Sequence, residues 1–185
     1  METRNHFALG RHILDSSGYA FKRAHRAAFI FGNIFPDINI FSYFRGHTYE
    51  GCYSALCRRI EKLKARRRLS VYDMFQLGAS IHYLADFFTT PHNKKFLGGL
   101  YQHYRYEKSL RPLFRRSLPA LEKLMKRQLP RPGPEKLGDL IRRIHLSYLS
   151  KSASFENDCF YITSMCSRMF NALLPPRAAA LAIGR

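Results

Sequence analysis

The chain has 185 residues, and its 31 Lys and Arg side chains outnumber its 13 Asp and Glu side chains, giving a formal net charge of +18 at pH 7. The length suits one compact domain and an apolar fraction of 46% can fill its core, which excludes a disordered chain and a fibre. Four cysteines without Cys-x-x-Cys spacing exclude a disulfide scaffold and predict reduced or buried thiols.

Long segments with the 3.6-residue periodicity of helices alternate with Pro, Gly and Ser, and no alternating pattern is long enough to predict a strand. Pro36 disfavours the helical conformation of the residue before it, so a turn is expected at residues 32–37. A second break is expected near Ser117 and Pro119, where the chain restarts. In chain order, helices are expected over residues 5–16, 19–31, 48–68, 70–88, 101–110, 135–150 and 154–173.

One of these helices is expected at the centre of the fold. Ser70 and Asp73 form a capping box at its start, and its apolar positions cover much of its circumference. The chain has no internal repeat, and the proline-rich loop at residues 130–134 is too short to separate domains. We therefore expect a single all-α domain over residues 1–174, followed by a loosely held tail at residues 175–185.

Two pairs of imidazole and carboxylate side chains recur at a spacing of four residues. His82 and Asp86 lie on the expected central helix and His103 and Glu107 on the next, so the members of each pair project from one face of a helix. Taken singly, each pair is more typical of a local hydrogen bond than of a metal site. Burying an ionisable pair on an apolar segment is nevertheless costly unless something binds it, and a divalent metal is one such partner.

Further residues of metal-ligand type surround the two pairs. His92 lies between them in sequence, and His6, Asp37 and His47 precede them. Because so many imidazoles and carboxylates occur together, the whole set favours a metal site formed between helices over separate hydrogen-bonded pairs. His145, by contrast, lies among basic residues and is expected to face solvent.

The order and spacing of these residues resemble the zinc-dependent phospholipase C family, whose all-α fold is shared with the single-strand-specific nucleases of the S1 and P1 type. A glutamate at position 107 favours the phospholipase branch, because the nucleases have aspartate there. The resemblance covers about residues 5–110 and is carried by the segments Gly32-Asn-Ile-Phe-Pro-Asp37, His82-Tyr-Leu-Ala-Asp86, Pro91-His92 and His103-Tyr-Arg-Tyr-Glu107.

The resemblance implies two or three zinc ions, with Asp86 bridging two of them. Family enzymes hold the third ion partly through an N-terminal Trp, which this chain lacks, so the Met1 amine or the Glu2 carboxylate would have to replace it. The implied ligands are Asp37, His47, His82 and Asp86 for one ion, His92, His103 and Glu107 for a second, and His6 for the third.

The implied activity is hydrolysis of a phosphodiester by metal-activated water. Zinc lowers the pKa of bound water toward about 7, and a second ion about 3.5 to 4 Å away can hold the phosphoryl oxygens. Asp37 is the expected catalytic residue, which would orient or deprotonate that water. As a phospholipase C, the enzyme would release diacylglycerol and a phosphorylated headgroup. Two alternatives stay open: a single-strand nuclease of the S1 or P1 type, and a non-catalytic binding protein that keeps zinc for folding.

The sequence also gives expectations about location and partners. The N-terminal residues lack an apolar stretch followed by a cleavage site, and no apolar stretch reaches the roughly 18 residues that a membrane span needs. We therefore expect a cytoplasmic protein that acts on a phospholipid or another phosphodiester. The excess of positive charge, which includes the basic run at residues 58–68, suits an anionic membrane surface or, as the alternative, nucleic acid.

Overall fold

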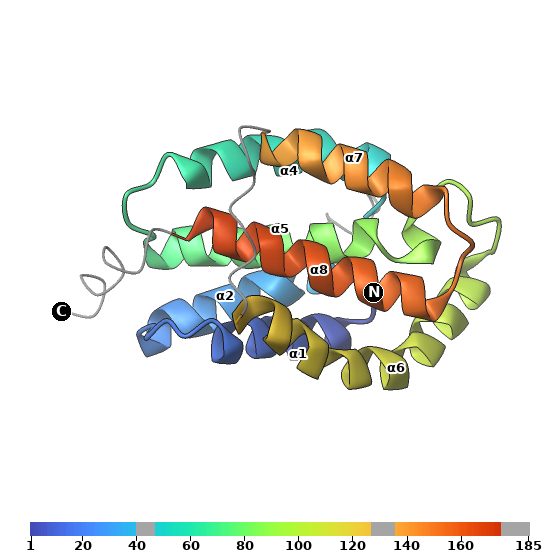
Figure 1. Ribbon diagram of the computed structural model, residues 1–185, viewed down its shortest axis with the longest axis horizontal. Coiled ribbons are helices and arrows are strands. Elements are labelled where there is room, and N and C mark those ends of the chain that lie inside the picture. Colours follow the sequence, from blue (N-terminus) through green and yellow to red (C-terminus); the bar gives the residue numbers. More distant parts are fainter. Residues whose placement is uncertain (40–46, 127–135, 175–185) are drawn as a thin grey trace.

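A computed structural model of the chain describes residues 1–39, 47–126 and 136–174. Over these ranges the regular structure is helical and contains no strand, which confirms the prediction of an all-α fold (Figure 1). The proline-rich loop at residues 130–134 and the tail at residues 175–185 lie outside the described residues. The elements are α1 (Thr3–Ser16), α2 (Arg23–Ile38), α4 (Tyr49–Lys64), α5 (Val71–Phe87), the 3-10 turn η1 (Thr90–His92), α6 (Leu100–Lys126), α7 (Leu137–Leu149) and α8 (Phe155–Leu173).

Helix α5 lies at the centre of the fold, as its apolar circumference predicts. It contacts α1 and α2 on one side, α4 on the other and α8 across its length, as Figure 1 shows. Its first turn carries the predicted capping box: the Asp73 N–H donates to Ser70 Oγ (3.1 Å), and the Ser70 N–H donates to Asp73 Oδ2 (2.9 Å). Among the described helices, none is both long and apolar enough to span a bilayer.

Helix α2 approaches α5 closely, and two glycines permit this. A Cβ at Gly32 would collide with the backbone of Phe75, and a Cβ at Gly78 would collide with the backbone of Phe29. The two backbones therefore meet where neither helix has a side chain. This approach brings the C-terminal end of α2, with Asp37, to the same side of the domain as the polar residues of α5.

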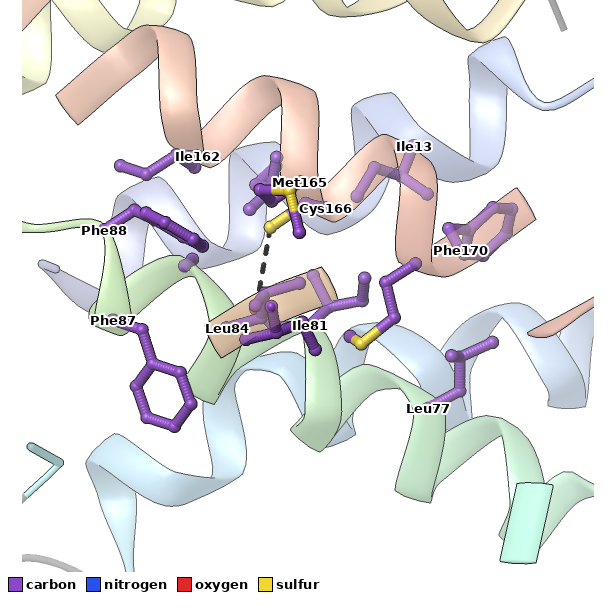
Figure 2. Packing of buried hydrophobic residues seen from close by; sticks show 14 of the residues in the cluster. Ile13, Leu77, Ile81, Leu84, Phe87, Phe88, Ile162, Met165, Cys166 and Phe170 are labelled. Atoms are coloured by element: carbon purple, nitrogen blue, oxygen red, sulfur yellow. Dashed lines mark hydrogen bonds between the residues drawn. The ribbon is translucent and has the colours of Figure 1, made fainter. Parts of the chain in front are cut away.

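Helix α8 covers α5 with apolar side chains, which Figure 2 shows at close range. Met165 and Phe170 of α8 are fully buried, as are Leu77 and Ile81 of α5. The thiol of Cys166 lies 3.8 Å from the Ile81 carbonyl oxygen. All four cysteines are free, two of them buried, as predicted.

The prediction of a turn at residues 32–37 is wrong, because α2 continues through Pro36 to Ile38. A proline inside a helix lacks the N–H that would bond to the carbonyl four residues earlier. Here the close packing of Gly32 on α5 and a hydrogen bond from His82 Nδ1 to the Asn33 carbonyl (2.9 Å) hold the segment in place. Asp37 consequently lies on a helix and not in irregular chain.

The predicted end of a helix at residue 110 and the predicted break near Ser117 and Pro119 are also wrong. Helix α6 continues through Pro112 and Pro119 to Lys126. Leu110 and Phe114 of α6 are fully buried, and α6 packs on both α1 and α8. Tertiary packing thus overrides the local preference of proline, as it commonly does for intrinsic propensities.

Candidate metal centre

All eight predicted ligands converge at one end of the domain. His6 comes from α1, Asp37 from α2, His82 and Asp86 from α5, His92 from η1, His103 and Glu107 from α6, and His47 from the residues just before α4. They form three groups in which one nitrogen or oxygen atom of each residue lies within 4.8 Å of the others. The groups are His6 with His82 and Asp86, Asp37 with His47 and His82, and His92 with His103 and Glu107.

The fully buried carboxylate of Asp86 lies between the groups. Its Oδ2 is 3.2 Å from His82 Nε2 and 3.3 Å from His47 Nδ1, while its Oδ1 is 3.1 Å from His6 Nε2 and 3.7 Å from His92 Nε2. Burial alone raises the pKa of this carboxyl, but the facing His92, the Met1 amine and His82 hold it well below its usual range. Asp86 is therefore ionised and points one oxygen at each side of the site.

The imidazole of His82 has its orientation set by the backbone of α2. Because a carbonyl oxygen only accepts, Nδ1 carries the proton that binds the Asn33 carbonyl, and Nε2 is left free to bind a cation. That Nε2 lies 3.3 Å from His47 Nδ1 and 3.6 Å from Asp37 Oδ1. Burial and the neighbouring His82 also lower the pKa of His6 to about 4, which keeps that imidazole in the neutral form that binds metals.

The third group joins η1 to α6. Glu107 Oε1 lies 3.0 Å from His92 Nε2 and 2.9 Å from His103 Nε2. Burial raises the pKa of the Glu107 carboxyl, but the Met1 amine and hydrogen bonds with His103 and His92 outweigh burial and lower it. The four-residue spacing of His103 and Glu107 therefore places both side chains on the face of α6 that turns toward the site.

The Met1 amine lies between Asp86 and the third group. It is 2.5 Å from Asp86 Oδ1, 2.8 Å from His92 Nε2 and 2.9 Å from Glu107 Oε1. Burial lowers the pKa of this amine, yet the two carboxylates outweigh burial and raise it to about 11. The carboxylate of Glu2 is paired with Arg111 instead, whose Nε donates to it at 2.7 Å. Of the two replacements for the family Trp, the amine is the one that lies among the predicted ligands.

The site opens into a cavity of about 580 Å³. Asp37, His47, His92, His103 and Glu107 all line it. A larger cavity of about 750 Å³, between α1, α2 and α6, contains none of the predicted ligands. The chemistry of the lining residues, and not the size of the cavity, therefore identifies the candidate site.

The residues present fit zinc. Four-coordinate zinc has bonds of about 2.0 to 2.1 Å to nitrogen and oxygen, which set neighbouring ligand atoms about 3.3 Å apart. In the second group His82 Nε2 lies 3.3 Å from His47 Nδ1 and 3.6 Å from Asp37 Oδ1, and in the third Glu107 Oε1 lies 3.0 Å from His92 Nε2 and 2.9 Å from His103 Nε2, all near this value. Among the described residues, the buried Asp37 Oδ2, Asp86 Oδ2 and His47 Nε2 have no hydrogen-bond partner. A bound cation would satisfy such unpaired carboxylate oxygens. The geometry therefore favours these residues as ligands, and their roles stay a prediction.

The expectation that His145 faces solvent is wrong. Its ring stacks on Tyr49, with ring centres 3.7 Å apart, and its Nε2 lies 2.7 Å from Asn93 Oδ1. Burial lowers the pKa of His145 to about 4, so the imidazole is neutral and Nε2 donates to the amide oxygen. The Asn93 amide in turn donates to the Phe87 and Thr89 carbonyls, which fixes the chain around η1.

A buried carboxylate on α8, which the sequence analysis did not single out, holds the other end of η1. Asp158 Oδ2 accepts from the Thr90 N–H (2.9 Å) and the Tyr106 hydroxyl (3.1 Å), and Oδ1 accepts from the Tyr148 hydroxyl (2.7 Å) and Thr90 Oγ1 (3.1 Å). Thr90 begins the turn that carries His92, and Tyr106 precedes Glu107. Asp158 therefore fixes two of the elements that present candidate ligands.

Comparison with known proteins agrees with this geometry. The sequence model of the family described as zinc dependent phospholipase C matches residues 5–155, more than three quarters of the chain. Neither the curated proteins nor the solved structures include a match. The family match supports zinc as the metal and a phosphodiesterase type of chemistry, and the three ligand groups are the residues on which that chemistry would depend. The chain belongs to the zinc-dependent phospholipase C family.

Proposed function

We propose that the protein is a phospholipase C that hydrolyses a phospholipid to diacylglycerol and a phosphorylated headgroup. The observation that carries this proposal is the convergence of three imidazole and carboxylate groups around Asp86, at the base of a cavity, in a chain of the zinc-dependent phospholipase C family. The three groups have room for two or three ions, and one of these groups consists of His6, His82 and Asp86.

Asp37 is the residue we assign to the attacking water. Its carboxylate lies at the cavity, with Oδ1 3.6 Å from His82 Nε2 and 3.8 Å from His47 Nδ1, and its Oδ2 has no hydrogen-bond partner among the described residues. An ionised carboxylate there can accept a proton from water and orient it toward a phosphorus atom. Zinc, when bound, supplies a water of lowered pKa and positive charge for the phosphoryl oxygens.

The imidazoles and carboxylates of the site would hold zinc, and the charge of that ion would stabilise the substrate phosphate. Asp86 is oriented by contacts on both of its oxygens, and His82 is oriented by the Asn33 carbonyl, so neither has to reorganise during the reaction. Exclusion of water follows from burial: His6, His82 and Asp86 are wholly inaccessible to solvent. The accessible part of the site is the cavity side, where Asp37, His103 and Glu107 lie.

The test is turnover as a function of zinc. We expect diacylglycerol release from phosphatidylcholine or an anionic phospholipid, loss of release after chelation, and recovery when zinc is added back. The Asp37→Asn variant should lose at least about a hundredfold in turnover, while elemental analysis still finds the ion held by His92, His103 and Glu107. Protein that holds two or three zinc ions and cleaves no phospholipid would overturn the proposal.

A nuclease of the S1 or P1 type is the second candidate, and the net charge of +18 is the observation that favours it. Digestion of single-stranded DNA or RNA that disappears in the His82→Ala variant would support the nuclease. A protein that uses zinc only for folding would instead melt at a much lower temperature after chelation and cut neither lipid nor nucleic acid.

A further inference from the structure

A run of exposed apolar side chains at the start of α6 reaches the metal-site cavity through Leu100. Leu97, just before α6, is 96% exposed, and Leu100, at the start of α6, is 81% exposed; Tyr101 and Tyr104 are each more than half exposed. We call these four residues the apolar rim. Leu100 also lines the cavity, and Tyr104 follows the candidate ligand His103. Clustered exposed apolar side chains are uncommon on a soluble surface and mark sites of interaction.

The rim is flanked by positive charge. Lys94, Lys95, Arg105 and Lys108 are exposed, and Glu107, which points into the site, is the one acidic residue in the sequence between positions 94 and 108. The Arg105 guanidinium lies 5.8 Å from the centre of the Tyr101 ring, and the Lys108 ammonium lies 5.9 Å from the centre of the Tyr104 ring. Cationic and apolar groups are therefore interleaved on one face of α6.

The helix geometry places this face next to the candidate ligands. Leu100 and Tyr104 are four residues apart, as are Tyr104 and Lys108, so all three lie along one stripe of α6. His103 and Glu107 form the adjoining stripe, which turns inward. A surface that contacts the outer stripe would consequently face the mouth of the cavity.

We propose that the apolar rim and its flanking cations dock on an anionic phospholipid bilayer. Leu97 and Leu100 enter the acyl-chain region, the tyrosines lie at the level of the headgroups, and Arg105 and Lys108 contact anionic phosphates. This orientation rests on the proposed function in one respect: it lets a phospholipid reach Asp37 without leaving the membrane. Nearly fully exposed leucines favour a bilayer over a nucleic acid, because they offer nothing to a phosphate backbone or a base edge.

Binding to vesicles tests the proposal without turnover. Zinc-loaded protein, and the same protein carrying Asp37→Asn, are sedimented with vesicles of phosphatidylcholine with and without phosphatidylserine. The double variant Leu97→Ser/Tyr101→Ser should lower partitioning by at least about tenfold, because the loss of one leucine from the acyl-chain region alone weakens binding by about that factor. Arg105→Gln/Lys108→Gln should lower partitioning by about tenfold on vesicles with phosphatidylserine and much less without it.

The matched control is Leu146→Ser/Phe160→Ser, which removes one leucine and one aromatic ring, each more than half exposed, from α7 and α8. This control should bind vesicles as the unmodified protein does. All three double variants should keep the melting temperature of the unmodified protein. If Leu97→Ser/Tyr101→Ser sediments as well as the unmodified protein, or if the control loses as much binding, the proposal is wrong. Loss of single-stranded DNA binding in Arg105→Gln/Lys108→Gln, with no vesicle binding by any form, would also overturn it in favour of nucleic acid.

A water-soluble phosphodiester separates docking from catalysis. Leu97→Ser/Tyr101→Ser should cleave bis(p-nitrophenyl) phosphate at the unmodified rate and cleave vesicle phospholipid about tenfold more slowly. If the unmodified protein binds vesicles through the rim but cleaves neither substrate, the proposed function fails and docking stands. If it cleaves both substrates and the rim variant cleaves them equally well, docking fails and the function stands.

Discussion

Two fully buried carboxylates, Asp86 and Asp158, lie in opposite surroundings. Burial raises the pKa of a carboxyl in both places, but at Asp86 the facing His92, the Met1 amine and His82 bring it well below its usual range. At Asp158 burial prevails and the pKa is raised, although a backbone N–H and three hydroxyls donate to its oxygens. Asp86 Oδ2 has no hydrogen-bond partner among the described residues, whereas both Asp158 oxygens are satisfied.

The difference separates a carboxylate arranged for a cation from one that the protein satisfies by itself. The two are nevertheless linked, because Asp158 holds Thr90 at the start of the turn that carries His92, and His92 lies 3.7 Å from Asp86. Asp158 thus positions part of the ligand set without touching it. Variants at the two positions should therefore change zinc binding by different amounts and for different reasons.

The largest effect is expected at Asp86. In Asp86→Asn a neutral amide replaces the charge that faces His6, His82 and His47, so we expect loss of at least one zinc ion and a fall in turnover of more than about a hundredfold. Elemental analysis and diacylglycerol release measure the two quantities. If Asp86→Asn retains full zinc and activity, the carboxylate is not a ligand and the contrast with Asp158 disappears.

A smaller effect on zinc and a clear effect on stability are expected at Asp158. In Asp158→Asn an amide NH₂ would face donors that now meet a carboxylate oxygen, which should lower the free energy of unfolding by about 2 to 3 kcal/mol. Because η1 is then held less firmly, zinc affinity should weaken by about tenfold. Urea unfolding and competition with a zinc chelator measure these changes. Complete loss of zinc in folded Asp158→Asn would place this residue among the ligands instead.

The sequence predicts the two ligand-bearing segments because their pattern is local. The four-residue spacing of His82 and Asp86, and the capping box of Ser70 and Asp73, depend only on helix geometry, and the capping box is confirmed. The helical conformation of Pro36 could not be predicted in this way. It depends on the packing of α2 against α5, in which Gly32 meets the backbone of Phe75, a residue distant in sequence.

The residues that support the ligands lack any local pattern. Asp158 meets Thr90, 68 positions away in sequence, and His145 meets Asn93, 52 positions away. Each looks like an ordinary surface residue on its own helix, and only the tertiary fold brings its partner to it. General chemistry predicts only that such supporting contacts exist: a metal-binding histidine usually donates its second ring N–H to an acceptor, as His82 does to the Asn33 carbonyl.

His145 extends the comparison to a buried imidazole, and its contribution to stability should depend on pH. Because burial lowers its pKa to about 4, against about 6.5 in the unfolded chain, the unfolded state binds the proton more tightly. Stability from the neutral imidazole is therefore complete above about pH 6.5 and is lost as the pH falls toward 4, with about 2 kcal/mol lost at pH 5. Urea unfolding at pH 7 and pH 5 should show a larger loss for the unmodified protein than for His145→Gln. Since zinc release with acid affects both proteins, equal losses would contradict the prediction.

The smallest effect is expected from Tyr148→Phe, which removes one donor from Asp158 and leaves the aromatic ring in place against Phe88. Asp158 keeps its bonds from Thr90 and Tyr106, so the loss should be about 1 kcal/mol, with no change in zinc affinity. Tyr106→Phe is the matched control, because it removes a hydroxyl from the same carboxylate on the helix that carries Glu107. If Tyr148→Phe destabilises the fold as much as Asp158→Asn, that carboxylate depends on a single hydroxyl. The contrast with Asp86 would then be weaker, because the stability of Asp158 would no longer rest on several hydrogen bonds that can replace one another.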